Sequence, residues 1–136
     1  MRVYGKGENI RDWLYVEDHA RALITVLRQG RGGEVYNIGG LDVEDNLSVV
    51  RQVLRLMGKS ESLLTHVKDR PGHDRRYAMD ISKIKRELGW RPKHSLAEGL
   101  RRTVEWYLAH PEWVNAIRRR KSYQQWLHQN YALRGS

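Results

Sequence analysis

The sequence contains no cysteine. This absence excludes disulfide frameworks, thiolate zinc sites and cysteine nucleophiles, so a hydrophobic core has to supply the stability. The sequence also lacks a run of about 18 apolar residues that would span a bilayer, and it lacks a charged and then apolar leader for secretion. We therefore expect a cytoplasmic protein that has no membrane partner.

A glycine-rich nucleotide loop is also missing. The glycines of 5–7 and of 30–33 do not have the G-x-G-x-x-G spacing, nor the preceding strand and following helix that give this motif its meaning. No tyrosine is followed by lysine four residues later. A metal site is poorly supported, because His73 and Asp74 have no companion ligands at recognised spacings. We therefore expect no catalytic residues, no cofactor site and no metal site in this chain.

The length of 136 residues fits a single domain, 1–136, with one modest core. The formal net charge is +9, and the basic excess lies in the C-terminal half: residues 69–136 hold 15 Lys and Arg against 7 Asp and Glu, whereas residues 1–68 hold 10 against 9. A composition with 40% hydrophobic residues and a mean hydropathy of −0.74 is typical of a folded, water-soluble domain.

Part of the basic excess is the run Arg118–Lys121, which lies near Trp113, Tyr123 and Trp126. Such a stripe suits nucleic acid, because phosphates attract cations and bases stack on aromatic rings. The alternative is a solvated helix face, which we favour because no nucleic-acid module signature accompanies the charge. A nucleic-acid partner is therefore not expected.

The apolar periodicity predicts an α/β or α+β-like fold of helices with a few short strands. The most regular signal is at Ser95 and Glu98, which fit a capping box at the start of a helix that Pro111 interrupts. The helix after Asp18 is expected from the apolar spacing of Ala20, Leu23, Ile24 and Leu27. The expected strands are a strand end at 3–4, which runs into a Gly-rich turn, and the segments 10–16, 34–40 and 63–67. The expected helices are 17–29, 46–57, 81–88, 96–108 and one restarting at 111.

Two segments are rich in side chains that bind anions. Arg11, at the edge of a turn, offers a planar fork of donors for a phosphate or carboxylate, although for this residue taken alone we favour an ion pair with Asp12 or with a neighbouring loop. The segment 69–76 holds three Arg, two Asp and one His around a Pro-Gly turn. This density favours a loop that faces a phosphate, with a solvated loop as the alternative. Asn46 or Asp45 can cap the helix that follows, and this structural role alone would account for Asn46.

Two long motifs, IRDWLYVEDHA at 10–20 and DRPGHDRRYA at 69–78, resemble the dTDP-glucose 4,6-dehydratases, which belong to the extended short-chain dehydrogenase/reductase family. YNIGG at 36–40 and ELGWRP at 87–92 extend the resemblance over nearly the whole chain. The resemblance is to the C-terminal, substrate-binding third of these enzymes. It implies that the Rossmann portion, with its NAD-binding glycine motif, Tyr-x-x-x-Lys pair and acid-base carboxylates, is absent here.

The resemblance also implies a set of substrate-binding residues. Arg11 would contact the diphosphate of a dTDP-sugar, the loop 69–73 would line the nucleotide site, and Tyr131 would close the site from the C-terminal tail. The residues implied in substrate binding are Arg11, Asn46, Asp69, Arg70, Pro71, Gly72, His73 and Tyr131.

The leading hypothesis is therefore the dTDP-glucose-binding portion of such a dehydratase, which converts dTDP-glucose to dTDP-4-keto-6-deoxyglucose with NAD in the intact enzyme. Without the Rossmann portion, the chain is expected to be inactive and to form a homo-oligomer through the exposed strand 34–40, which has lost its neighbours in the sheet. The alternative is a non-catalytic basic module that binds nucleic acid or a protein partner.

Overall fold

The computed structural model describes residues 1–129, and the contacts group the chain into two compact units, Met1–Arg101 and Arg102–Ser136. The elements of the first unit are β1 (Arg2–Tyr4), β2 (Ile10–Trp13), α1 (Val16–Gln29), β3 (Asp42–Asp45), α2 (Asn46–Leu56), the 3-10 turn η1 (Glu61–Leu63), β4 (Thr65–Val67), β5 (Arg76–Tyr77), α3 (Ser82–Leu88) and the start of α4 (Leu96–Ala109). Helices with a few short strands were predicted, and this fold class is confirmed.

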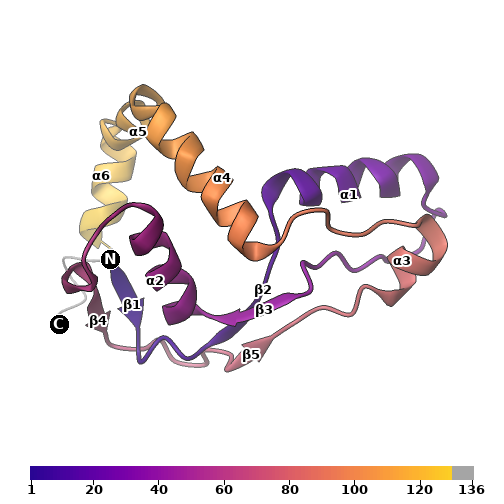
Figure 1. Cartoon of the computed structure of the whole chain (residues 1–136), viewed down its shortest axis with the longest axis horizontal. Coiled ribbons are helices and arrows are strands. Elements are labelled where there is room, and N and C mark those ends of the chain that lie inside the picture. The colour runs from indigo at the N-terminus through magenta and orange to yellow at the C-terminus, as the bar shows by residue number, and fades with distance from the viewer. Residues whose placement is uncertain (130–136) are drawn as a thin grey trace. The chain divides into compact units, whose positions relative to one another are not determined.

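The five strands form two small sheets. β1 pairs with β4 in parallel, and β2 lies between β3, to which it is antiparallel, and β5, to which it is parallel. In this second sheet Arg11 lies opposite both Glu44 and Tyr77. Within the first unit, this sheet lies between α1 and α3 at one end and α2, β1 and β4 at the other (Figure 1).

The sequence did not predict β3 or β5. β3 reads Asp-Val-Glu-Asp and β5 is two residues long, so neither shows an apolar alternation of period two. The predicted strand 10–16 is correct for 10–13 only, because α1 already begins at Val16. The predicted strand 63–67 is shortened to 65–67, because η1 occupies 61–63.

The main core joins α1, α3 and the turn after α3. Its buried members are Ala22, Ile81, Ile84 and Trp90. Packed around these four are Leu14, Val26, Tyr36, Ile38, Met79 and Leu88. Other buried apolar side chains of the unit lie on β1 and α2: Val3, Val49 and Leu54.

Helix α1 was predicted, but the apolar stripe that predicted it does not face this core. Leu23, Ile24 and Leu27 are 52%, 50% and 85% exposed, whereas the buried positions are Asp18 and Ala22. The spacing therefore identified the helix correctly and a different face is buried in this chain.

The prediction of a strand over 34–40 is wrong, since these residues have no strand pairing. Side chains and close packing hold the segment instead. Lys83 Nζ donates to the Val35 carbonyl at 2.9 Å, and the Asn37 amide donates to the Asp80 carbonyl at 3.3 Å. Tyr36 and Ile38 pack against the main core. The segment therefore packs on this chain's own α3 and core, and no ladder of backbone bonds is needed.

A buried aspartate joins α1 to the turn before α4. Asp18 is 1% exposed, and its Oδ2 accepts the backbone N–H groups of Lys93 and His94, both at 2.9 Å. His94 Nδ1 lies 3.1 Å from the same oxygen, and Arg21 donates to Oδ1. Burial opposes the charge of Asp18, but the hydrogen bonds from Arg21 and from His94 and Lys93 outweigh it and lower the pKa.

The second unit contains the rest of α4, α5 (Pro111–Arg118) and α6 (Lys121–Leu127). The restart at Pro111 is confirmed, with proline in the first turn of α5. Trp106 stacks on the His110 ring at 4.4 Å between centroids and meets Trp113 edge-to-face at 5.2 Å. Both indoles are nearly half exposed, so this aromatic cluster is a surface feature of the unit.

Candidate functional site

Arg11 lies in β2 and holds the end of the loop 69–76. Its Nη2 donates to the Asp74 carbonyl at 3.0 Å, and its Nη1 donates to the Ile10 carbonyl at 2.6 Å. Both acceptors are neutral carbonyl oxygens. Within residues 1–129, the Asp12 carboxylate is not a partner of Arg11. A guanidinium has five N–H groups, so the charge of Arg11 and its remaining donors stay available to an anion.

Asn9 connects Arg11, the loop and α2, and sequence reasoning missed it. Its side-chain Nδ2 donates to the Asp74 carbonyl at 3.0 Å, the same oxygen that Arg11 holds. Its own carbonyl accepts the backbone N–H of Asn46 at 3.1 Å. The signal available in the sequence was an amide side chain next to the Gly-rich turn, two residues before Arg11. Asn9 thus brings Arg11, Asn46 and Asp74 together.

Asn46 is the first residue of α2, but it is not the helix cap. Asp45 takes that role, because its Oδ1 accepts the Ser48 backbone N–H at 2.8 Å and its Oδ2 accepts the Ser48 hydroxyl at 2.6 Å. These hydrogen bonds from Ser48 are the main reason why the pKa of Asp45 is lowered. The structural role that made Asn46 ambiguous in the sequence therefore belongs to its neighbour.

The first half of the loop is anchored on β1 and the turn after it. Asp69 Oδ1 lies 2.7 Å from His73 Nδ1, and the His73 ring meets the Tyr4 ring edge-to-face at 6.3 Å. The contact with His73 is the main cause of the lowered pKa of Asp69. Gly5 has φ 54°, and a Cβ there would lie 2.8 Å from Asp69 Oδ2, so glycine permits this close approach.

The tip of the loop carries the other expected residues. Arg70, Pro71 and Gly72 are exposed, and Gly72 has φ 65° in the left-handed region. The structure thus brings Arg11 beside the Asp74 carbonyl, while Asp69 pairs with His73, the residue that precedes Asp74. Tyr131 lies outside the described residues.

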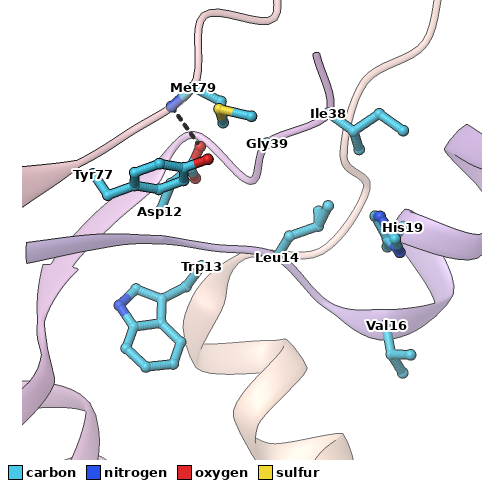
Figure 2. Close-up of a pocket in the computed structure, with 9 residues that line it drawn as sticks. All are labelled: Asp12, Trp13, Leu14, Val16, His19, Ile38, Gly39, Tyr77 and Met79. Atoms are coloured by element: carbon cyan, nitrogen blue, oxygen red, sulfur yellow. Dashed lines mark hydrogen bonds between the residues drawn. The ribbon is translucent and has the colours of Figure 1, made fainter. Parts of the chain in front are cut away.

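A hollow of about 440 Å³ lies at the end of the three-stranded sheet, where β2 leads into α1 (Figure 2). Apolar side chains such as Leu14, Val16 and Ile38 dominate its lining, and His19 and Tyr77 add polar groups. Asp12 also lines it and accepts the Met79 backbone N–H, the dashed line in Figure 2. Within residues 1–129, the lining is Asp12, Trp13, Leu14, Val16, His19, Ile38, Gly39, Tyr77 and Met79.

The residues present do not fit an NAD pyrophosphate. Gly5 and Gly7 lie between two strands, and the glycines of 30–33 follow a helix, so neither group lies between a strand and the N-terminus of a helix. No step of hydride transfer is therefore assigned to these residues. Within residues 1–129, no group of three or more His, Asp or Glu side chains could hold a metal ion.

The basic run Arg118–Lys121 lies at the junction of α5 and α6, so it does not line one helix face. Its four residues are exposed.

Within residues 1–129, no helix is long and apolar enough to cross a membrane.

Comparisons with known proteins point to sugar-nucleotide enzymes. The sequence profile of the family described as GDP-mannose 4,6 dehydratase matches residues 1–103. A dTDP-glucose 4,6-dehydratase from Shigella flexneri is 53% identical over 96% of this chain. The solved dTDP-glucose 4,6-dehydratase from Bacillus anthracis str. Ames, in complex with NAD, is 48% identical over 82% of this chain with a TM-score of 0.77. The same enzyme from Streptomyces venezuelae, with NAD and TYD bound, is 44% identical over 83% of this chain with a TM-score of 0.79.

The chain spans about 38% of the length of the Shigella relative and 35% of each of the two solved chains. The alternative of a basic module for nucleic acid or a protein partner gains no support from these relatives. The resemblance first noted at residues 10–20 and 69–78 is confirmed. This chain therefore belongs to the GDP-mannose 4,6 dehydratase family of extended short-chain dehydrogenases/reductases, and it corresponds to part of the dTDP-glucose 4,6-dehydratases in it.

Proposed function

We propose that this chain provides the sugar-nucleotide-binding part of a cytoplasmic dTDP-glucose 4,6-dehydratase, with dTDP-glucose as its ligand. The observation that carries the proposal is the placement of Arg11. This strand residue donates one N–H group to the Asp74 carbonyl of the loop 69–76 and another to the Ile10 carbonyl of its own strand, and it keeps further donors for a diphosphate. The solved dTDP-glucose 4,6-dehydratase from Streptomyces venezuelae, which has NAD and TYD bound, supports the choice of ligand.

The proposed contribution of these residues to the reaction is binding and orientation. A diphosphate held by Arg11 and the loop would fix the sugar at a defined distance from the reacting groups. Binding energy at such a remote handle assists catalysis by positioning the reacting carbon. The isolated chain is inactive in this proposal, because the hydride acceptor and the acid-base groups belong to family segments that it does not match.

A homo-oligomer is a further part of the proposal. The segment 34–40 is not a strand, so unpaired strand edges no longer support self-association, but exposed apolar side chains do. Val35 is 76% exposed, and Val16, Leu23 and Leu27 of α1 are 68%, 52% and 85% exposed. An apolar surface of this kind on a folded unit favours burial against another protein surface.

The experiment that tests nucleotide binding is a chemical-shift titration of the 15N-labelled chain with dTDP. We expect weak binding, with a dissociation constant in the millimolar range or poorer, because only part of the family pocket is present. Arg11→Ala should weaken binding by about tenfold or more, since charge-assisted contacts are the strongest that a side chain makes to phosphate. Its melting temperature should barely change.

Arg28→Ala is the matched control, because Arg28 is an exposed arginine in the last turn of α1. It removes the same charge from the same unit and should leave the dTDP affinity unchanged. Equal losses of dTDP affinity in both variants would show that binding depends only on the net charge of the chain and not on the position of Arg11. If Arg11→Ala unfolds the chain, and a folded, uncharged Arg11→Gln chain binds dTDP like the wild type, Arg11 is a structural residue and the proposal fails.

A further inference from the structure

The carboxylate of Asp12 joins three segments of the backbone at the end of the three-stranded sheet. Asp12 Oδ1 accepts the Gly40 backbone N–H at 2.8 Å, and Asp12 Oδ2 accepts the Met79 backbone N–H at 3.2 Å (Figure 2 shows the second bond). The donors are 28 and 67 residues away in the sequence. Each carboxylate oxygen thus holds a different distant segment of backbone.

The two donors flank the neighbours of β2. Gly40 lies two residues before β3, and Met79 lies two residues after β5, so the Asp12 carboxylate fastens both outer strands to the central one. The pairing of β2 with β3 has four residue pairs, whereas that of β2 with β5 has only two. β5 therefore depends more on this additional attachment than β3 does.

The register of β5 against β2 determines which backbone group of the loop 69–76 lies beside Arg11, the proposed anion-binding side chain. Arg11 lies opposite Tyr77, and the Ile10 N–H donates to the Arg75 carbonyl at 2.9 Å. This alignment places the Asp74 carbonyl within reach of Arg11. A slip of one residue would move Asp74 away and turn the side chains of β5 to the opposite face.

The backbone of residues 39–40 packs closely against Asp12 and its strand. A Cβ on Gly40 would lie 1.6 Å from the Trp13 carbonyl oxygen, and one on Gly39 would lie 2.3 Å from Asp12 Oδ2. The 39–40 backbone therefore lies directly against β2. An ionised carboxylate is an acceptor at both oxygens, whereas a carboxamide has one acceptor and turns an NH2 group toward the second donor.

We propose that Asp12 is a positioning residue of the sugar-nucleotide site, which acts on Arg11 and Asp74 by fixing the register of β5 through Met79. The identity of the ligand rests on the proposed function, whereas the positioning itself rests on the hydrogen bonds of this chain. Asp12 holds backbone and does not contact the ligand in this proposal.

The first test is amide hydrogen exchange, measured by NMR on the wild-type chain and on Asp12→Asn. We expect the amides of Met79, Gly40 and Ile10 to exchange about tenfold faster or more, because each depends on the Asp12 attachment or on the register that it fixes. The amides of α2 should keep their protection. Equal acceleration at all protected amides would show general destabilisation, and unchanged exchange at Ile10 would show no control of register; either result overturns the proposal.

Asp42→Asn is the matched control. Asp42 Oδ2 also accepts a distant backbone N–H, that of Leu96 at 2.6 Å, but this bond attaches the start of α4. In this variant the Leu96 amide should lose protection while the Ile10 amide keeps it. If Asp12→Asn does not fold, Met79→Pro carries the test, because it removes one donor and leaves the carboxylate in place; the Ile10 amide should again lose protection.

The second test is the dTDP titration of the same variants. Removing a negative charge near an anion site should strengthen binding by electrostatics alone, so a loss of about tenfold per folded molecule in Asp12→Asn identifies positioning. Unchanged or tighter binding overturns the proposed role of Asp12 and leaves the proposed function intact. If the wild-type chain does not bind dTDP, the proposed function fails, and the exchange pattern still decides whether Asp12 sets the register.

Discussion

The two faces of α1 have opposite roles in this chain. The inner face contains Ala22, which is fully buried against the main core, and Asp18, which holds the turn before α4. The outer face carries Val16, Leu23 and Leu27 at helical spacing, all more than half exposed. The comparison shows that an apolar stripe identifies a helix but does not say which side the chain itself covers. Of the two faces of α1, we therefore expect the inner one to contribute far more to the stability of the first unit.

The largest effect is expected from truncation of the side chain that packs under the inner face. Ile84 of α3 is 0% exposed and belongs to the same cluster as Ala22. Ile84→Ala should lower the free energy of unfolding by about 3 kcal/mol, since it loses buried surface and leaves a cavity. Urea denaturation followed by circular dichroism measures the change. A loss below about 1 kcal/mol would show that this cluster is not the core of the unit.

A smaller loss is expected from the polar member of the inner face. Asp18→Asn keeps the shape of the side chain but removes the charge that Arg21 and the N–H groups of Lys93 and His94 share, which should cost about 2 kcal/mol at pH 7. A loss as large as that of Ile84→Ala would show that the polar contacts of Asp18 stabilise the unit as much as the apolar packing does.

The contribution of Asp18 should also depend on pH. Its pKa in the folded chain lies below the ordinary value of 3.8, so the unfolded chain binds the proton more tightly. The stabilisation is therefore complete above about pH 4 and is lost as the pH falls below that value. The difference in unfolding free energy between the wild type and Asp18→Asn should shrink when urea titrations at pH 7, 4 and 3 are compared. A constant difference would contradict the assignment.

The smallest effect on stability is expected on the outer face. Leu27 is 85% exposed, so Leu27→Lys should change the free energy of unfolding by less than about 0.5 kcal/mol. The same change should weaken self-association, because it places a charge on the exposed stripe. Sedimentation velocity over a range of concentrations measures this. A wild-type chain that stays monomeric would remove the proposed oligomer, and a large loss of stability would erase the distinction between the two faces.

Local signals predicted the helices well. The capping box at Ser95, the glycine after Leu88 and the proline at 111 each act through bonds or dihedral angles within a few residues, so the sequence shows them directly. The strands were predicted less well. β3 and β5 are too polar or too short for an alternation to appear, and they exist because β2 pairs with both.

The candidate site shows the same division. The sequence by itself determined the family and singled out Arg11 and the loop 69–76, because their residue types and order are distinctive. Only the tertiary structure decided that Arg11 and Asn9 meet the loop at the Asp74 carbonyl and that Asp12 holds the Met79 backbone. The physical reason is that these contacts join residues 63 to 67 positions apart, and no local pattern of hydrophobicity or capping records which distant backbone group a side chain will bind.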